Sequence, residues 1–205
     1  VRLYSVLQEG KGLWNCPNLY LHKFPAERFT LTARLTFRPH PVLRGEEAGV
    51  VVMGKDYASL RLTDTPEGAR LQLVLCADAP GGGEEQPCSL EVIPYAFRTV
   101  SHAHESGNVP RVHYPDRPEC TLWVRLEVQA SPVEGQVPDA VCRLSYSRDG
   151  KCYTPAGGTF TARPGVWVGA HFGFYCNRFA SGNDAGALDV EALSLVLEGD
   201  PPRAQ

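Results

Sequence analysis

The chain has 205 residues, of which 43% are hydrophobic and 21% charged, and its formal net charge is −3. This composition is typical of a globular protein and not of a disordered one. The lack of a basic run argues against a nucleic-acid partner, because phosphate binding needs clustered Lys and Arg. No apolar stretch approaches the roughly 20 residues that cross a bilayer, so we expect no membrane partner. The length fits one domain over residues 1–205.

The clearest predicted strand spans Phe29–Phe37, where apolar side chains alternate with three threonines and Arg34. A period of two over this length indicates a strand with one buried and one solvated face. A Pro-rich turn follows at residues 38–41. The next run, Val50–Met53, is continuously apolar and lies between two glycines, which favours a strand buried on both faces.

Further alternating runs are separated by Gly- and Pro-rich turns and occupy Tyr57–Thr63, Leu71–Cys76, Leu122–Val128, Cys142–Tyr146, Val166–Cys176 and Leu188–Leu197. The Asp149-Gly150 pair predicts a hairpin after the fourth of these runs. Gly169 and Gly173 on one face predict close approach of another backbone or of a ligand. The last run changes phase near Ala192, as a β-bulge would cause.

Helical spacing is nowhere sustained for more than about two turns. Many short strands with frequent turns indicate an all-β fold, a two-sheet antiparallel β-sandwich or a barrel. The stretches Ala77–Gln86 and Ser101–Arg117 are predicted to be loops.

The seven cysteines contain no Cys-x-x-Cys pair, which argues against a zinc site, and they are too few for a disulfide scaffold. Cys76 and Cys88 flank a predicted loop, so a disulfide between them is one expectation. Cys142 and Cys152 lie too far apart along the predicted hairpin to pair. Buried free thiols are the simpler prediction, and the cysteines leave the cellular compartment open.

Two sets of side chains in the sequence have the chemistry of metal ligands. Hard oxygen ligands lie near the last strand and predict a calcium site at Asn183, Asp184 and Asp189, with a solvated turn as the alternative. The pair His102 and His104 lacks enough further ligands for zinc, so surface histidines are the simpler interpretation. No other cofactor is expected.

Sugar binding is a candidate activity of this chain. Aromatic rings stack on pyranose C–H surfaces, and neighbouring polar groups form hydrogen bonds with the sugar hydroxyls. The candidate contacts form two clusters: Trp14, Asn15, Asn18 and Tyr20 before the first clear strand, and Trp167, His171 and Tyr175 on the non-core face of a later one. In the alternative interpretation, loops or a neighbouring domain cover these aromatic rings.

Several segments carry a family resemblance, and they follow one another in the family's order: Leu13–Ala26, Gly45–Ala58, Leu122–Val128, Ser145–Gly150, Pro164–Ala170 and Gly173–Cys176. With them, the chain resembles the C-terminal concanavalin A-like β-sandwich domain of glycoside hydrolase family 43, of the β-xylosidase and α-L-arabinofuranosidase type. The aromatic residues that usually close this domain are missing after Gly186. The resemblance implies a concanavalin A-like jelly roll.

The resemblance also implies a function and partners. It implies an accessory domain that packs on a five-bladed propeller catalytic domain, in the parent chain or in a separate chain, and that serves the degradation of a plant polysaccharide or oligosaccharide. Trp167 would then close the substrate pocket of that catalytic domain. Leu3-Tyr4-Ser5 resembles the usual start of the domain, which favours an excised domain or a processed chain.

Two other functions remain as alternatives. One is a free-standing carbohydrate-binding module. The other is a glycosidase in its own right, which needs two carboxyl groups about 5 to 9.5 Å apart at the scissile bond. Asp189 and Glu191 share one strand face, but Ala187 stands where enzymes of this fold carry the nucleophile. We therefore expect no catalytic residue in this chain.

Overall fold

The structure is a computed structural model that describes residues 1–98, 117–130, 139–165, 169–182 and 184–198. In these ranges, no helix is long and apolar enough to cross a membrane. The elements are β1 (Arg2–Tyr4), β2 (Val6–Leu7), the 3-10 helix η1 (Leu13–Asn15), β3 (Leu19–Lys23), β4 (Arg28–Arg38), β5 (Glu47–Met53), β6 (Tyr57–Thr65), β7 (Gly68–Cys76), the 3-10 helix η2 (Ala79–Gly81), β8 (Glu85–Ile93), β9 (Ala96–Arg98), β10 (Arg117–Ala130), β11 (Ala140–Ser147), β12 (Thr154–Pro155), β13 (Phe160–Ala162), β14 (His171–Arg178) and β15 (Ala187–Leu197).

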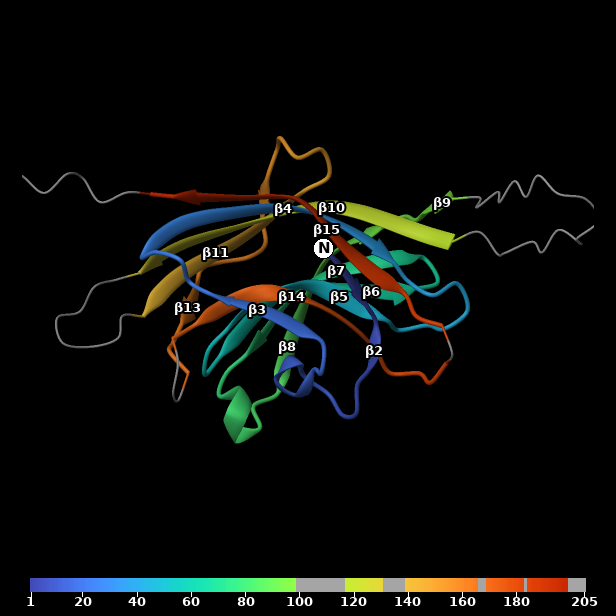
Figure 1. Ribbon diagram of the computed structural model, residues 1–205, viewed down its shortest axis with the longest axis horizontal. Coiled ribbons are helices and arrows are strands. Elements are labelled where there is room, and N and C mark those ends of the chain that lie inside the picture. Colours follow the sequence, from blue (N-terminus) through green and yellow to red (C-terminus); the bar gives the residue numbers. More distant parts are fainter. Residues whose placement is uncertain (99–116, 131–138, 166–168, 183, 199–205) are drawn as a thin grey trace, which may run out of the picture.

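The strands form two sheets that stack face to face (Figure 1). The first sheet has the order β1-β15-β4-β10-β11-β12, with β13 added beside β11 and β9 beside β10. The second has the order β2-β14-β5-β6-β7-β8, with β3 beside β14. The predicted two-sheet sandwich is confirmed. The pairings given for the described residues are antiparallel except that of β2 with β14, so the second sheet is mixed.

The core lies between the sheets and follows the alternation of the sequence. The inward side chains of β4 are at most 1% exposed, and they are Phe29, Leu31, Ala33, Leu35 and Phe37. The facing sheet contributes Val50, Val52 and Leu60 to the same cluster. Burying each large aliphatic or aromatic side chain stabilises the fold by about 1.5 to 3 kcal/mol.

The predicted bulge and the predicted close approach at Gly173 are confirmed. The register of β15 on β4 shifts between Glu191 and Ser194, and Ala192 has a φ of 47°. A Cβ on Gly173 would collide with the carbonyl oxygen of Tyr20, so this glycine permits the pairing of β14 with β3. By contrast, β8 begins at Glu85, inside the predicted loop Ala77–Gln86.

All seven cysteines are free. The expected disulfide between Cys76 and Cys88 is wrong, because β7 and β8 pair in a register that sets Cys76 opposite Glu85 and Cys88 opposite Leu73. Five of the thiols are buried, as expected for cysteines that serve as small hydrophobic side chains.

Candidate functional site

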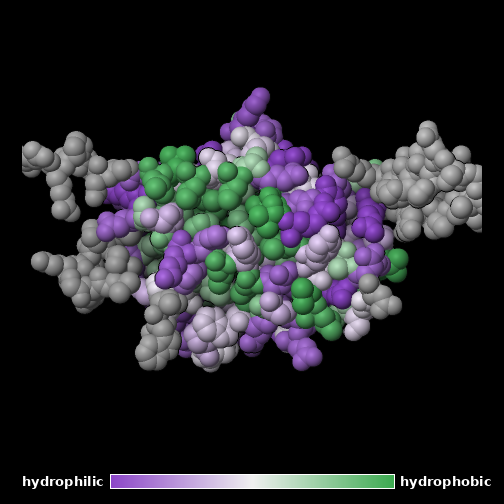
Figure 2. Space-filling model, viewed as in Figure 1, coloured by the Kyte–Doolittle hydropathy of each residue, from purple (hydrophilic) through white to green (hydrophobic). Residues whose placement is uncertain are grey.

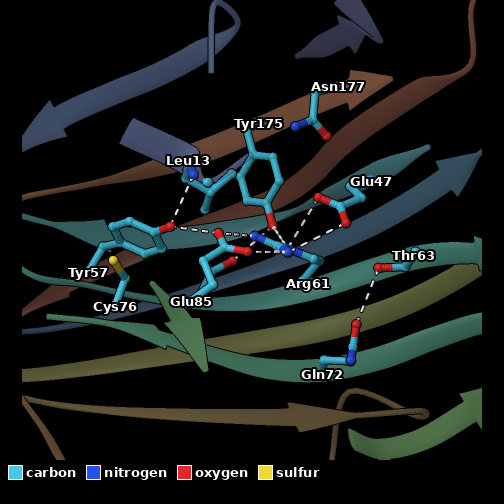
Figure 3. A network of polar contacts seen from close by, with 12 residues as sticks. Leu13, Glu47, Tyr57, Arg61, Thr63, Gln72, Cys76, Glu85, Tyr175 and Asn177 are labelled. Carbon is cyan, nitrogen blue, oxygen red and sulfur yellow. Dashed lines mark hydrogen bonds and ion pairs between the residues drawn. The ribbon is translucent and has the colours of Figure 1, made fainter. Parts of the chain in front are cut away.

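A buried polar network lies on the outer face of the second sheet (Figure 3). Arg61 of β6 is at its centre and is only 6% exposed. Its guanidinium donates to Glu85 at 2.8 Å and, more weakly, to Glu47 at 3.4 Å. It also donates to the Tyr175 hydroxyl at 3.3 Å. Strand periodicity places Arg61, Glu47, Glu85 and Tyr175 together, because every second residue of β5, β6, β8 and β14 points to this face.

The network also fastens the segment that covers this face. Tyr57 donates its hydroxyl proton to Glu85 at 2.6 Å and accepts the backbone N–H of Leu13, in η1, at 3.1 Å. Leu13 is 1% exposed and packs with Val51 and other side chains in a second apolar cluster. Residues of η1 therefore cover the outer face of β5, which is why that strand is buried on both sides, as its sequence predicted.

The two carboxyl groups that share Arg61 have pKa values shifted in opposite directions. Burial raises the pKa of Glu47 to about 7, although the charge of Arg61 opposes this. Burial also acts on Glu85, but its hydrogen bonds and ion pair with Arg61 lower its pKa below the usual value. The shorter contacts of Arg61 go to Glu85, so Glu47 is the partner that takes up a proton first.

Replacing Glu47 by Gln is expected to flatten the pH dependence of stability. A carboxyl group whose pKa is about 7 in the folded chain, against about 4.3 unfolded, binds more protons in the native state between these values. The free energy of unfolding of the unchanged protein should therefore fall as pH rises through that window, by on the order of 3 kcal/mol. Glu47→Gln removes the titrating group and with it this fall.

The measurement is urea unfolding at several pH values between 4.5 and 8. Glu27→Gln, at an exposed position between β3 and β4, is the matched control and should keep the fall. Equal slopes for the unchanged protein and Glu47→Gln would contradict this assignment.

An apolar groove of about 240 Å³ opens between the edges of the two sheets. Phe172 and Phe174 of β14 and Leu31 of β4 line its inner part, and Leu193 and Leu195 of β15 line its outer part. No carboxyl group is among its lining residues. Sequence reasoning did not predict this groove, because the pattern of Leu193 and Leu195 indicates a strand but not what covers it.

The acidic residues of β15 lie on the other face of that strand, outside the groove. Leu188 and Val190 are buried, so alternation turns Asp189 and Glu191 outward. Asp189 accepts hydrogen bonds from Arg2 at 2.6 and 2.8 Å and also from Arg38, and the bonds from Arg2 are the main cause of its lowered pKa.

Glu191 is exposed and forms an ion pair with Arg34 at 2.9 Å. Neither Asp189 nor Glu191 lines the apolar groove.

The model of one protein family, described as the β-xylosidase C-terminal concanavalin A-like domain, matches residues 1–191. The chain belongs to this family. No individual curated protein matches the chain in a sequence search.

Solved structures with the same fold include glycoside hydrolases of family 43. A mutant of BlXynB from Bacillus licheniformis has 19% sequence identity over 96% of this chain, with a TM-score of 0.58. A xylan β-1,4-xylosidase from Bacillus halodurans has 15% identity over 96% of the chain and a TM-score of 0.57. A family 43 enzyme engineered for both endo-xylanase and exo-arabinofuranosidase activity has 16% identity over 96% and a TM-score of 0.64. This chain spans only 32 to 34% of these three structures.

In this C-terminal domain, the residues of the first predicted glycan cluster lie in three different surroundings. Trp14 is 44% exposed, and Asn15 beside it in η1 is also exposed. Asn18 instead donates its amide to the carbonyl oxygens of Tyr4 at 2.6 Å and Cys176 at 3.2 Å, which ties three segments together. Tyr20 is 44% exposed and belongs to the apolar groove.

The second predicted cluster includes one residue that requires correction. Tyr175 is 0% exposed, and its hydroxyl is hydrogen-bonded to Ser59 at 2.9 Å, so its ring offers no face to a sugar. It belongs to the buried network of the domain. His171 is half-buried at the start of β14. Trp167 lies outside the described residues, and its role at a substrate pocket stays a prediction.

The predicted calcium site loses one of its three ligands. Both carboxyl oxygens of Asp189 already accept hydrogen bonds from guanidinium groups, which would repel a cation. Asp184 is exposed, and Asn183 lies outside the described residues. Within the described part of the chain, no group of three or more His, Cys, Asp or Glu side chains could hold a metal ion. Calcium binding by Asn183 and Asp184 stays a prediction.

Proposed function

We propose that this chain is a non-catalytic accessory domain of a family 43 glycoside hydrolase that acts on xylose- or arabinose-containing plant polysaccharides. The observation that carries the proposal is the match of the C-terminal domain family over residues 1–191. In a protein of this kind, the partner is a five-bladed propeller catalytic domain. The sandwich packs against it and, through Trp167, contributes to the edge of its substrate pocket.

The side chains of the described residues support the accessory role. The outward carboxyl groups of β15 are bound to arginines, and the apolar groove contains no acidic residue. The carboxyl groups that the sequence offered for glycoside hydrolysis are therefore engaged by arginines and lie outside the groove.

A carbohydrate-binding module is the second candidate function, and the exposed pair Trp14 and Asn15 favours it. An indole ring beside an amide on a surface helix is a suitable contact for a sugar. The two functions differ in what they require: an accessory domain needs its catalytic partner, whereas a binding module retains xylan or arabinan on its own.

The test compares residues 1–205 with the parent protein on aryl-xyloside and aryl-arabinoside substrates. We expect turnover by the parent and none by residues 1–205 alone, and we expect propeller repeats to be encoded upstream of Val1. Hydrolysis by residues 1–205 that disappears in Glu191→Gln would show instead that this chain is itself an enzyme. Retention of the isolated chain on insoluble xylan, lost in Trp14→Ala, would favour the binding module.

A further inference from the structure

The groove is a part of the sandwich core that the described residues leave open. Leu195 and Leu197 of β15 lie opposite Leu31 and Phe29 of β4 in register, so they point inward. Their partners are 1% exposed, whereas Leu195 and Leu197 themselves are 42% and 53% exposed. Inward-facing leucines with this exposure indicate a missing piece of core rather than an ordinary surface.

The open region is continuous along one side of the molecule. Figure 1 shows the end of β15 at the upper left, in the sheet that lies above the one containing β3. Figure 2 shows hydrophobic side chains gathered on the surface over the same part of β15. Tyr20 of β3 and Leu193 of β15 line the groove from the two sides.

The outer edge of β15 is also unpaired along this stretch. On one side, β15 pairs with β4 as far as Leu197. On the other side, β1 pairs only with residues 187–189, and the ladder ends where Val1 and Val190 exchange backbone hydrogen bonds of 2.9 and 2.7 Å. Among the described residues, no strand continues along the edge at residues 191–197. An unpaired edge beside an apolar surface is a site for strand addition.

The register of β1 indicates what occupies this edge. Arg2 lies opposite Asp189 and Tyr4 opposite Ala187, so each step back along β1 is a step forward along β15. A chain that continues β1 before Val1 therefore runs along residues 191–197. Val1 and Leu3 line the groove, so alternation points the second and fourth residues before Val1 into it as well.

We propose that the polypeptide immediately preceding Val1 in the parent protein extends β1 along the free edge of β15 and fills the groove with alternate apolar side chains. This rests on the proposed function, which supplies a longer chain. The segment that leads into the domain then completes its core. The sandwich is thereby held to the preceding domain by backbone hydrogen bonds and buried side chains, and not by a flexible tether.

The first test is hydrogen exchange of the β15 amides in the parent protein and in residues 1–205 alone. We expect exchange within residues 191–197 to be at least about tenfold slower in the parent, because paired edge amides open less often. Equal exchange in the two proteins would overturn the proposal.

A pair of variants in both proteins separates the groove from the strand. Leu195→Asp places a charge in the groove, whereas Val196→Asp places it on the opposite face of the same strand, where Val196 is 57% exposed. In the parent, Leu195→Asp should lower Tm by about 5 °C more than Val196→Asp. In residues 1–205 this difference should be much smaller. The same difference in both proteins would contradict the proposal.

The outcomes also distinguish this inference from the proposed function. A parent that hydrolyses glycosides but leaves residues 191–197 unprotected overturns the inference alone. Protection of this edge in a parent without glycosidase activity supports the inference and overturns the proposed function. If residues 1–205 alone become protected as concentration rises, and light scattering reports a dimer, the occupant is a second copy and the proposal is wrong.

Discussion

Replacing Arg61 with alanine is expected to lower the free energy of unfolding by about 3 to 5 kcal/mol, because it leaves buried carboxyl groups without their cation. Arg61 is 6% exposed and is the shared donor for Glu85, Glu47 and Tyr175. For a chain of this length, the loss corresponds to a decrease in Tm of about 10 °C.

Arg70→Ala is the matched control for this prediction. Arg70 is exposed on the neighbouring strand β7, where it lies opposite Thr63. Its replacement should change stability by no more than about 0.5 kcal/mol. Thermal unfolding followed by circular dichroism measures both variants. Similar small losses for the two arginines would show that the buried network does not stabilise the domain.

The network also joins the sheet to the segment that presents Trp14 and Asn15. Leu13 is hydrogen-bonded to Tyr57, which in turn donates to Glu85. The Arg61→Ala variant should therefore loosen η1 before the whole domain unfolds. A change in tryptophan fluorescence below the main transition that is absent when Trp14 is also replaced by Phe would report this local opening.

Gly49→Ala is expected to cost at least about 3 kcal/mol, because overpacking against backbone in a central strand has no side chain that can move aside. A Cβ at Gly49 would overlap the carbonyl oxygen of Leu60 and lie 3.1 Å from its carbonyl carbon. Strands β5 and β6 are paired on both sides of Gly49, from residues 47 to 53 of β5. The overlap can therefore be removed only if the two backbones separate.

Gly158→Ala is the control for Gly49→Ala, since a Cβ at Gly158 would meet no atom within 4 Å. This second change should be close to neutral. Urea denaturation of the two variants is the measurement. A Gly49→Ala variant as stable as Gly158→Ala would contradict the close approach of β5 and β6.

The sequence was most informative where one strand face is buried and the other solvated. In β4, the alternation alone identified all five core side chains, and the phase change at Ala192 identified the bulge of β15. Short strands carried too few residues for a period to be recognised. For this reason β1, β2 and β9 were not predicted. The start of β8 was assigned to a loop because three consecutive glycines, residues 81–83, stand just before it.

The candidate site shows what the tertiary structure decided. Alternation correctly placed Tyr175 on the face away from the core, but it could not show that η1 covers this tyrosine. It put Asp189 and Glu191 on one strand face, but it could not show that Arg2 and Arg38 bind Asp189. It also gave no sign that Leu195, which faces inward, would remain 42% exposed. The sequence by itself determined an all-β fold and the direction of the side chains in its longer strands, because these depend on local periodicity. Its resemblance to known segments indicated the family and the sandwich. What lies against each face depends on contacts between segments far apart in the chain, and only the folded structure provides them.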